Sequence, residues 1–303
     1  MQTFNIKIGG EAGQGLVSIG NILLRAITQE GWHLFAHQDY ESRIRGGHNF
    51  FQIRLANKPV ASWENEIDVL VALDETTIIL GQGELRSSGV VIYDPGVLGE
   101  KAKELGNQPN YLGLPFGQIA EELGQPKIVA NAAAAGAIWA LLSDDLITLH
   151  QTLDVMFGSK GKKVVEGNQK VATAGFDKVR EVMGSRSKPA KPERQGERLL
   201  LKGNDALPLG ALSAGLKFMS AYPMTPATGV TEFIAEYGRE VSAVMEQAED
   251  EISAINMAIG ASYTGVRAMT ATSGGGFALM TEALSLAGSA EIPIVVINAM
   301  RPG

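Results

Sequence analysis

Apolar residues in the first part of the chain repeat with the spacings of strands and helices in turn. Residues 4–8 alternate as a short strand, and residues 16–25 carry apolar side chains at helical spacing. Further short apolar runs, typical of strands, cover residues 50–55, 67–73 and 89–93. The last two runs are followed by Asp74 and Asp94, and we expect them to be buried parallel strands. The alanine-rich residues 128–142 predict a long apolar helix that packs closely.

The last third of the chain shows the same alternation. A helix rich in alanine, glycine and leucine follows Gly203-Asn204-Asp205 and continues to Leu216. Strand candidates then occur at residues 241–245, 267–270 and 293–298, and helices between them at residues 251–263 and 276–286. Together with the apolar run that ends at Ala221, this alternation predicts a parallel sheet of four strands. For the whole chain we therefore expect an α/β fold with two Rossmann-like parallel-sheet domains.

Residues 185–198 are expected to link these two parts. The segment is rich in proline and basic residues, and apolar content resumes only at Leu199. Its positive charge suits either a solvated tether or contact with an acidic surface. A chain of 303 residues is long enough for two domains, and we predict them at residues 1–184 and 199–303.

Charge and residue usage exclude several classes of function. A net charge of −7 gives no bulk attraction to nucleic acid, so no nucleic-acid partner is expected. The first residues lack a basic region followed by an apolar core, and no apolar run could span a bilayer, which predicts a cytoplasmic protein without a membrane partner. The absence of cysteine excludes a disulfide, a catalytic thiol and a cysteine-bound iron–sulfur cluster within this sequence. The i, i+4 pair His33 and His37 lacks a matching third ligand, so no metal site is predicted.

Two glycine-containing segments of the first part are candidate anion sites. Gly10, Gly13 and Gly15 lie between a predicted strand and a helix, where backbone N–H groups and the helix dipole favour an anion. A tight turn that packs the helix on the sheet is the alternative. The spacing differs from Gly-x-Gly-x-x-Gly and no acidic ribose partner follows, which disfavours a nicotinamide cofactor. Arg43 and Arg45, beside paired glycines, suit either a phosphate or carboxylate cradle or a salt-bridge loop between subunits.

The strongest candidate site of the second part combines a rigid turn with a group of carboxylates. Pro223 and Pro226 restrict the backbone of the turn that carries the hydroxyl of Thr225. Glu249 and Glu251 flank a predicted strand-to-helix junction, where the helix dipole favours acidic groups and capping explains most of them. A carboxylate at this place also suits a hydrogen bond to the ring nitrogen of an aminopyrimidine, which would promote proton movements in a thiamine cofactor.

These motifs together resemble a known family. The Tyr-Pro-Met-Thr-Pro turn, the Glu-Asp-Glu-Ile-Ser-Ala-Ile-Asn helix and the Thr-Ala-Thr-Ser-Gly-Gly-Gly-Phe loop at residues 270–277 resemble the alpha subunit of 2-oxoacid:ferredoxin oxidoreductases. Gly-Gly-Glu-Ala-Gly-Gln-Gly and Ser-Arg-Ile-Arg-Gly-Gly are similar to the gamma domain of that family. The order gamma then alpha resembles the fused alpha subunit of 2-oxoglutarate:ferredoxin oxidoreductases, over nearly the whole chain.

The resemblance assigns roles to residues of the second part. From about residue 199 onward, the chain would form the pyrimidine-binding half of a thiamine diphosphate site, with Tyr222 and Pro223 contacting the cofactor. Glu251 would be the carboxylate that activates the cofactor, and Glu249 is the alternative. Thr225 and Arg301 would bind the carboxylate of the 2-oxoacid, Arg301 by its bidentate guanidinium, unless it is an ordinary surface arginine. The glycine loop and the arginine loop of the first part would be possible coenzyme A contacts.

The resemblance also implies a reaction and partners. The family decarboxylates a 2-oxoacid oxidatively with coenzyme A, or runs the reverse carboxylation, and we expect 2-oxoglutarate as the substrate and ferredoxin as the electron acceptor. The sequence contains no Gly-Asp-Gly segment with a downstream asparagine, the kind that binds Mg²⁺ and the diphosphate, and no cysteine. Both groups would therefore be on a beta-type partner, without which this chain is inactive. A homo-oligomer of the heteromer is expected.

Two further expectations concern the extent and the role of the chain. The fused subunits of the family continue beyond the segment that ends here at Arg301-Pro302-Gly303, so we expect a C-terminally truncated chain with an incomplete second domain. Its thin sheet would depend on oligomerisation or on the gamma domain for stability. The alternative function is a non-catalytic module that binds coenzyme A or assembles such a complex.

Overall fold

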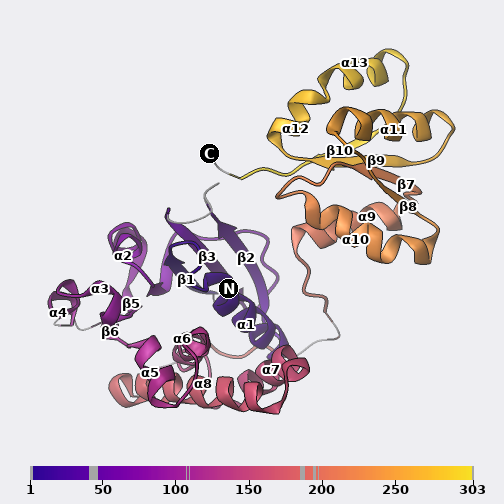
Figure 1. Cartoon of the computed structure of the whole chain (residues 1–303). Helices are drawn as coiled ribbons and strands as arrows, with labels where there is room; N and C mark the ends of the chain where they lie inside the picture. The colour runs from indigo at the N-terminus through magenta and orange to yellow at the C-terminus, as the bar shows by residue number, and fades with distance from the viewer. Residues whose placement is uncertain are drawn as a thin grey trace. The chain divides into compact units, whose positions relative to one another are not determined.

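The computed structural model describes residues 3–40, 47–106, 108, 110–184, 188–193, 196 and 198–301. The chain divides into two compact units, residues 1–198 and residues 199–302. Figure 1 shows the first unit from indigo to pink and the second from orange to yellow, each built of helices around one sheet. The expected α/β class with two sheets rich in parallel strands is confirmed.

The first unit has a six-stranded sheet in the order β2-β3-β1-β4-β5-β6. Its strands are β1 Thr3–Gly10, β2 His33–Asp39, β3 Asn49–Ala56, β4 Ile67–Ala72, β5 Leu85–Tyr93 and β6 Tyr111–Gly113. The sheet is parallel except for β3, which runs antiparallel to both β1 and β2. The pattern of the sequence did not predict β2, in which no residue is fully buried, or β6, which has three residues.

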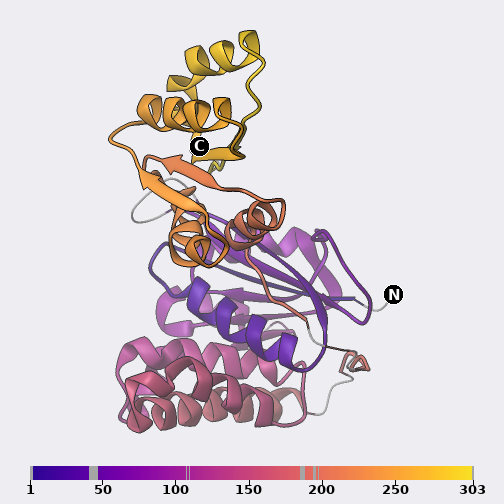
Figure 2. The ribbon, with the colours of Figure 1, turned by 90° about the vertical axis from the view of Figure 1, so that its right-hand side faces the viewer.

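Helices cover both faces of this sheet. They are α1 Leu16–Gln29, α2 Glu75–Gly81, α3 Pro95–Leu98, α4 Lys101–Leu105, α5 Phe116–Glu122, α6 Ala130–Trp139, α7 Ile147–Phe157 and α8 Lys162–Met183. The main core lies between the sheet and α1, α5, α6, α7 and α8, and a smaller core lies under α2 and α3. In Figure 2 the indigo α1 and the pink helices lie together on one side of the first sheet.

Helices α6 and α8 approach one another closely through glycine and alanine. A Cβ on Gly136 would overlap the carbonyl oxygen of Ala172, and a Cβ on Gly175 would overlap the carbonyl oxygen of Ala133. The expected close packing is therefore present, but the prediction of one helix over residues 128–142 was wrong in extent. A 3₁₀ turn, Lys127–Val129, precedes α6 because Pro126 restricts the backbone there, and residues 141 and 142 continue α6 with bonds to carbonyls three residues back.

One carboxylate connects polar side chains on the face of the sheet opposite α1. Glu64 accepts hydrogen bonds from Thr3 Oγ1 at 3.3 Å and Asn5 Nδ2 at 3.0 Å. It also pairs with the guanidinium groups of Arg54 and Arg86. Asn5 and Arg54 are opposite one another in the pairing of β1 with β3, and both are buried. This network allows polar residues to occupy inward positions of two central strands.

Basic residues of the linker contact carboxylates and two carbonyl oxygens of the first unit. Lys188 Nζ donates to the carbonyl of Ser143 and the carboxylate of Asp144. Lys191 Nζ lies 2.6 Å from a carboxylate oxygen of Glu30. Arg198 donates to the carbonyl oxygen of residue 31 at 3.0 Å. The described part of this segment is therefore held on the first unit by its cations.

The second unit has a four-stranded parallel sheet in the order β10-β9-β7-β8. Its elements are α9 Gly203–Ser213, β7 Phe218–Ala221, α10 Thr228–Tyr237, β8 Val244–Gln247, α11 Glu251–Tyr263, β9 Ala268–Thr272, α12 Gly274–Leu279, α13 Thr281–Ser289 and β10 Val295–Asn298. Side chains of α9 and α10 pack on one face of the sheet, and those of α11 and α13 on the other. Figure 1 shows these two helical layers on either side of β7 to β10.

Two predictions for this unit were wrong in detail. Residues 238–241, partly expected as strand, form a 3₁₀ turn, and β8 begins only at Val244 because Ser242 adopts a left-handed conformation with φ 59°. The helix expected over residues 276–286 is two helices. The backbone breaks at Met280, whose N–H bonds to Phe277 three residues back and whose side chain is fully buried in the core. Among the described helices, none is both long and apolar enough to cross a membrane.

Because α6 and α8 approach so closely, we expect one added methyl group between them to reduce the stability of the protein. We expect Gly175→Ala to lower the free energy of unfolding by about 1–3 kcal/mol, because the new Cβ forces the helices apart. Urea unfolding monitored by circular dichroism measures this change. Gly158→Ala is the control, since a Cβ at position 158 would meet no atom within 4 Å and the backbone there is helical. Equal stability of the two variants would contradict the close packing.

The contact of Asp144 with the linker predicts that the amine of Lys188 is protected from chemical modification. The hydrogen bond from Lys188 lowers the pKa of Asp144, and the charges of Lys188, Arg180 and Lys191 lower it further. A carboxylate with a lowered pKa keeps its stabilising contact at neutral pH and loses it only as the pH falls through that lowered value. At neutral pH we therefore expect Asp144→Asn to raise the rate at which an acetylating reagent modifies Lys188, measured by mass spectrometry.

The matched control is Asp177→Asn, which removes another exposed carboxylate, on α8. It should leave the labelling of Lys188 unchanged. An equal rise in both variants would indicate an effect of net charge and would contradict the specific contact.

Candidate functional site

The candidate site lies at the carboxyl edge of the second sheet. Because β7, β8, β9 and β10 are parallel, the loops that follow all four strands meet at this edge. The neighbouring strands β7 and β9 lead into helices on opposite faces, α10 on one and α12 and α13 on the other. Open α/β sheets bind ligands at such a switch point.

The turn after β7 presents a hydroxyl group to solvent. Its backbone closes through a hydrogen bond from Ala227 N–H to the Met224 carbonyl at 2.9 Å, and the Thr225–Pro226 peptide bond is cis. Thr225 is exposed, and Tyr222 is 37% exposed, so both predicted contact residues are accessible to a ligand. Pro223, the other predicted cofactor contact, is also exposed.

A side chain from α9 holds this turn. Asn204 Nδ2 donates to the carbonyl oxygen of Pro226 at 2.9 Å. A Cβ on Gly229, in the first turn of α10, would lie 3.1 Å from the same Nδ2 atom. The amide therefore packs between the turn and the helix that follows. Sequence reasoning gave Asn204 no role, and its only signal was a polar residue just before a predicted helix.

The predicted carboxylates separate into different environments at the start of α11. Asp250 caps the helix, since its carboxylate accepts from the Ser253 N–H at 2.7 Å. Glu249, after the end of β8, is exposed. Glu251 is only 4% exposed, and its Oε1 atom is buried without a hydrogen-bond partner among the described residues. A buried carboxylate oxygen without a donor is costly, which indicates that another group completes this site.

The loop after β9 leaves room for this carboxylate. A Cβ on Gly276 would overlap Thr272 Oγ1 and would lie 2.6 Å from Glu251 Oε1. Only glycine at position 276 therefore lets the carboxylate and the hydroxyl occupy their places. Sequence reasoning included Gly276 and Thr272 only as part of a motif and assigned neither a role.

The loop after β10 carries Arg301 and is attached to the neighbouring strand. Ala299 N–H donates to the Thr272 carbonyl at 3.0 Å, continuing the pairing of β10 with β9. A Cβ on Gly274 would lie 3.1 Å from Met300 Sδ, so the two loops are in contact. Arg301 is half-buried at the same edge as Thr225 and Glu251. The structure thus brings the three predicted residues of the second unit to one edge.

The donor set fits the aminopyrimidine of thiamine diphosphate. A buried carboxylate oxygen without a partner suits a ring nitrogen that shares a proton with it. The exposed turn supplies a hydroxyl, and the guanidinium of Arg301 matches a carboxylate. The edge can therefore hold an aromatic nitrogen base and a small carboxylic acid.

The glycine loop of the first unit joins β1 to α1 as predicted. Gly13 and Gly15 have φ values of 92° and 90°, and Gly15 caps α1. Gln14 Oε1 accepts from the N–H of residue 11 at 2.7 Å, which closes the loop on itself. A Cβ on Gly15 would overlap the amide of Asn131, so this close approach requires glycine. Gly10 ends β1, and the predicted arginines Arg43 and Arg45 lie outside the described residues.

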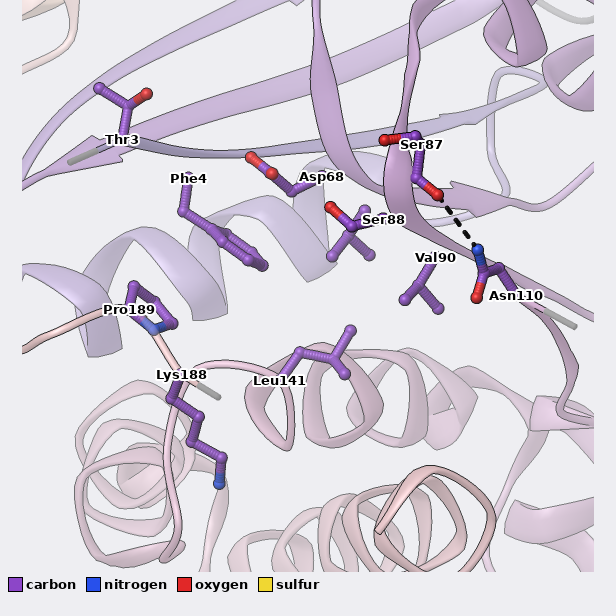
Figure 3. Close-up of a pocket in the computed structure, with 11 residues that line it drawn as sticks. Thr3, Phe4, Asp68, Ser87, Ser88, Val90, Asn110, Leu141, Lys188 and Pro189 are labelled. Atoms are coloured by element: carbon purple, nitrogen blue, oxygen red, sulfur yellow. Dashed lines mark hydrogen bonds between the residues drawn. The ribbon is translucent and has the colours of Figure 1, made fainter. Parts of the chain in front are cut away.

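A separate pocket of about 550 Å³ lies at the amino-terminal ends of β1, β4 and β5. Figure 3 shows Phe4 pointing into it, with Pro189 and Leu141 on other sides. Both charged side chains of its lining already have partners. Asp68 accepts from Arg86 at 3.2 Å, and Lys188 contacts Asp144. None of the predicted site residues lines this pocket.

The histidine pair His33 and His37 lies on strand β2. The ring of His37 stacks on Trp63, with ring centroids 4.7 Å apart. In the part of the chain that the structure describes, no group of three or more His, Cys, Asp or Glu residues is arranged to hold a metal ion.

Each of the two units matches a model of a known protein family. Residues 5–178 match the family model described as pyruvate ferredoxin/flavodoxin oxidoreductase. The chain belongs to this family. Residues 209–303 match the thiamine diphosphate-binding model of the pyruvate flavodoxin/ferredoxin oxidoreductases. The resemblance drawn from the sequence motifs is therefore confirmed, and the second unit contains the family's thiamine diphosphate-binding domain.

The curated relatives include alpha subunits of 2-oxoacid:ferredoxin oxidoreductases. The chain is 27% identical to the alpha subunit of 2-oxoacid:ferredoxin oxidoreductase 2 from Aeropyrum pernix, with 100% of this chain and 56% of that protein covered. It is 30% identical to the 2-oxoacid:ferredoxin oxidoreductase alpha subunit from a Sulfolobus species, covering 98% and 54% respectively. The chain thus spans about half the length of these relatives. Over 105 residues it is 45% identical to the 2-oxoglutarate synthase subunit KorA of Methanothermobacter thermautotrophicus, covering 35% of this chain and 28% of that subunit.

Solved structures in the family share this fold. A 2-oxoglutarate:ferredoxin oxidoreductase from Magnetococcus marinus, with 2-oxoglutarate, coenzyme A and succinyl-CoA bound, matches with a TM-score of 0.87 and 30% identity. The match covers 100% of this chain and 53% of that one. The gamma subunit of a keto/oxoacid ferredoxin oxidoreductase from Geobacter sulfurreducens matches 60% of this chain and 99% of its own, at a TM-score of 0.50 and 24% identity, which shows the fold alone.

Proposed function

We propose that this chain is the alpha-type part of a 2-oxoacid:ferredoxin oxidoreductase and that its second unit forms the aminopyrimidine side of a thiamine diphosphate site. The observation that carries the proposal is the buried Oε1 atom of Glu251, which has no partner in the described chain and lies where Gly276 lacks a Cβ. A ring nitrogen that shares a proton with this carboxylate would satisfy it. The family match of residues 209–303 supports the same site.

Each predicted residue of this edge has a role in the proposal. Glu251 holds or releases a proton at the ring nitrogen of the aminopyrimidine. Thr225 and Arg301 bind and orient the carboxylate of the 2-oxoacid, for which a guanidinium offers a bidentate fit. Tyr222 and Pro223 contact the cofactor from the exposed turn. Thiamine diphosphate, when bound, supplies the electron sink for decarboxylation.

The remaining parts of the reaction are proposed to come from a beta-type partner. The sequence has no cysteine for an iron–sulfur cluster and no Gly-Asp-Gly segment for Mg²⁺ and diphosphate. The partner would hold these groups and pass electrons to ferredoxin. We expect the heteromer to form a homo-oligomer.

Coenzyme A is proposed to contact the first unit through the glycine loop and the arginine loop. Gly13 and Gly15 open the N-terminus of the 14-residue helix α1, where N–H groups and the helix dipole favour phosphate. Arg43 and Arg45 would add positive charge. The related Magnetococcus marinus structure contains coenzyme A, which supports this ligand for the complex.

The role of Glu251 predicts a large loss of turnover in Glu251→Gln. We expect the full-length protein with its beta-type partner to reduce a viologen dye with a 2-oxoacid and coenzyme A. Glutamine cannot exchange the proton, so the variant should lose roughly 10²–10⁴-fold in kcat. Steady-state kinetics measures this loss.

The control is Glu249→Gln, which neutralises the exposed carboxylate two residues earlier. It should keep most of the turnover. A loss of turnover in Glu249→Gln alone would assign the proton exchange to Glu249. Full turnover in both variants would contradict the proposed site. A complex without any turnover would favour the binding or assembly module.

The relatives predict 2-oxoglutarate as the preferred substrate. The chain is 45% identical to a 2-oxoglutarate synthase subunit over 105 residues, and the related Magnetococcus marinus enzyme has 2-oxoglutarate bound. A panel of 2-oxoglutarate, pyruvate and a branched 2-oxoacid on the reconstituted complex should give the highest kcat/KM with 2-oxoglutarate. A higher value with pyruvate would contradict this specificity while leaving the thiamine site unaffected.

A further inference from the structure

Three buried polar atoms between the second sheet and α11 have no hydrogen-bond partner among the described residues. They are Glu251 Oε1, Thr272 Oγ1 and Thr270 Oγ1. Both threonines are fully buried on β9. By contrast, the buried hydroxyl of Ser220 on the neighbouring strand donates to the Ala254 carbonyl at 2.6 Å. Buried hydroxyls are normally paired, so these unpaired atoms require an explanation.

The positions of these atoms distinguish the two threonines. A Cβ on Gly276 would have Thr272 Oγ1 as its nearest neighbour and Glu251 Oε1 at 2.6 Å. The hydroxyl of Thr272 and the carboxylate of Glu251 therefore share the small space that glycine leaves open. Thr270 is not among the nearest atoms at this point.

The backbone of Thr272 is fixed independently of its hydroxyl. Its carbonyl accepts from Ala299 N–H at 3.0 Å, and Thr272 pairs with Asn298 at the end of β10. A hydroxyl on so rigid a strand end can rotate its hydrogen toward an acceptor at little cost. A carboxylate, in turn, keeps one orientation better when a donor holds one of its two oxygens.

We propose that Thr272 is a positioning residue for Glu251, whose Oε1 atom accepts a hydrogen bond from the Thr272 hydroxyl when thiamine diphosphate is bound. Oε1 has a second lone pair, which remains available to the ring nitrogen of the aminopyrimidine. Gly276 is required because any side chain there would displace both groups. The inference rests on the proposed role of Glu251.

The test uses the full-length protein with its beta-type partner and two readouts. One is the affinity for thiamine diphosphate, measured by calorimetry, and the other is the rate at which the C2 proton of the bound cofactor exchanges for deuterium, measured by quenched-flow NMR. Thr272→Val removes the hydroxyl and should slow the exchange by about tenfold or more, because a hydrogen bond to a charged group is lost. The KM for the 2-oxoacid should stay within about twofold of the wild type.

Thr272→Ser keeps the donor and should restore the exchange rate. Thr270→Val is the matched control, since it removes an equally buried hydroxyl two residues earlier on the same strand, and it should exchange like the wild type. If Thr272→Val does not fold, Thr272→Ala compared with Thr272→Ser provides the same contrast.

Exchange in Thr272→Val at the wild-type rate, or an equal loss in Thr270→Val, would overturn the inference. The second result would indicate packing instead of positioning. Wild-type exchange in Glu251→Gln would overturn the proposed function itself. Slow exchange in Glu251→Gln together with wild-type exchange in Thr272→Val would overturn only the role of Thr272.

Discussion

The candidate site depends on the common direction of the four strands of the second unit. Parallel pairing places the ends of β7, β8, β9 and β10 at one edge, so loops from distant parts of the sequence meet there. One buried carboxylate then gives this edge its chemical character. Glu251 is held at the start of α11 by a helix that Asp250 caps, and its oxygen fits only because position 276 has no side chain. Backbone direction and one missing methyl group together create the place for a ligand.

The sequence predicted most of this arrangement, because strands and helices with strong apolar periodicity need little context. Helix α11 begins and ends at the predicted residues, and the α/β class follows from simple alternation. The elements that were missed or misplaced depend on tertiary contacts. Strand β2 has only partly covered side chains, and the polar residues Asn5 and Arg54 occupy inward positions because Glu64 binds both. Apolar spacing carries no information about such a network.

The chemistry of the site was predicted from motifs, but the contacts that support it were not. Thr225, Glu251 and Arg301 were identified by resemblance, and the structure places them at one edge of the sheet. Asn204 and Thr272 had no signal in the sequence beyond being polar residues beside a helix or a strand end. Their importance follows from the carbonyl, the glycine or the carboxylate that each one meets in three dimensions.

The hydrogen bond between Ala299 and the Thr272 carbonyl has a consequence for the energetics of the edge. It connects the loop of Arg301 to the strand end that lies beside Glu251. A shift of this bond would change the surroundings of both residues at once. Substitutions on the two sides should therefore show a coupling energy in a double-mutant cycle instead of simple additivity. Were the aminopyrimidine and the 2-oxoacid bound as proposed, this bond would couple their two affinities, and linkage makes such a coupling reciprocal.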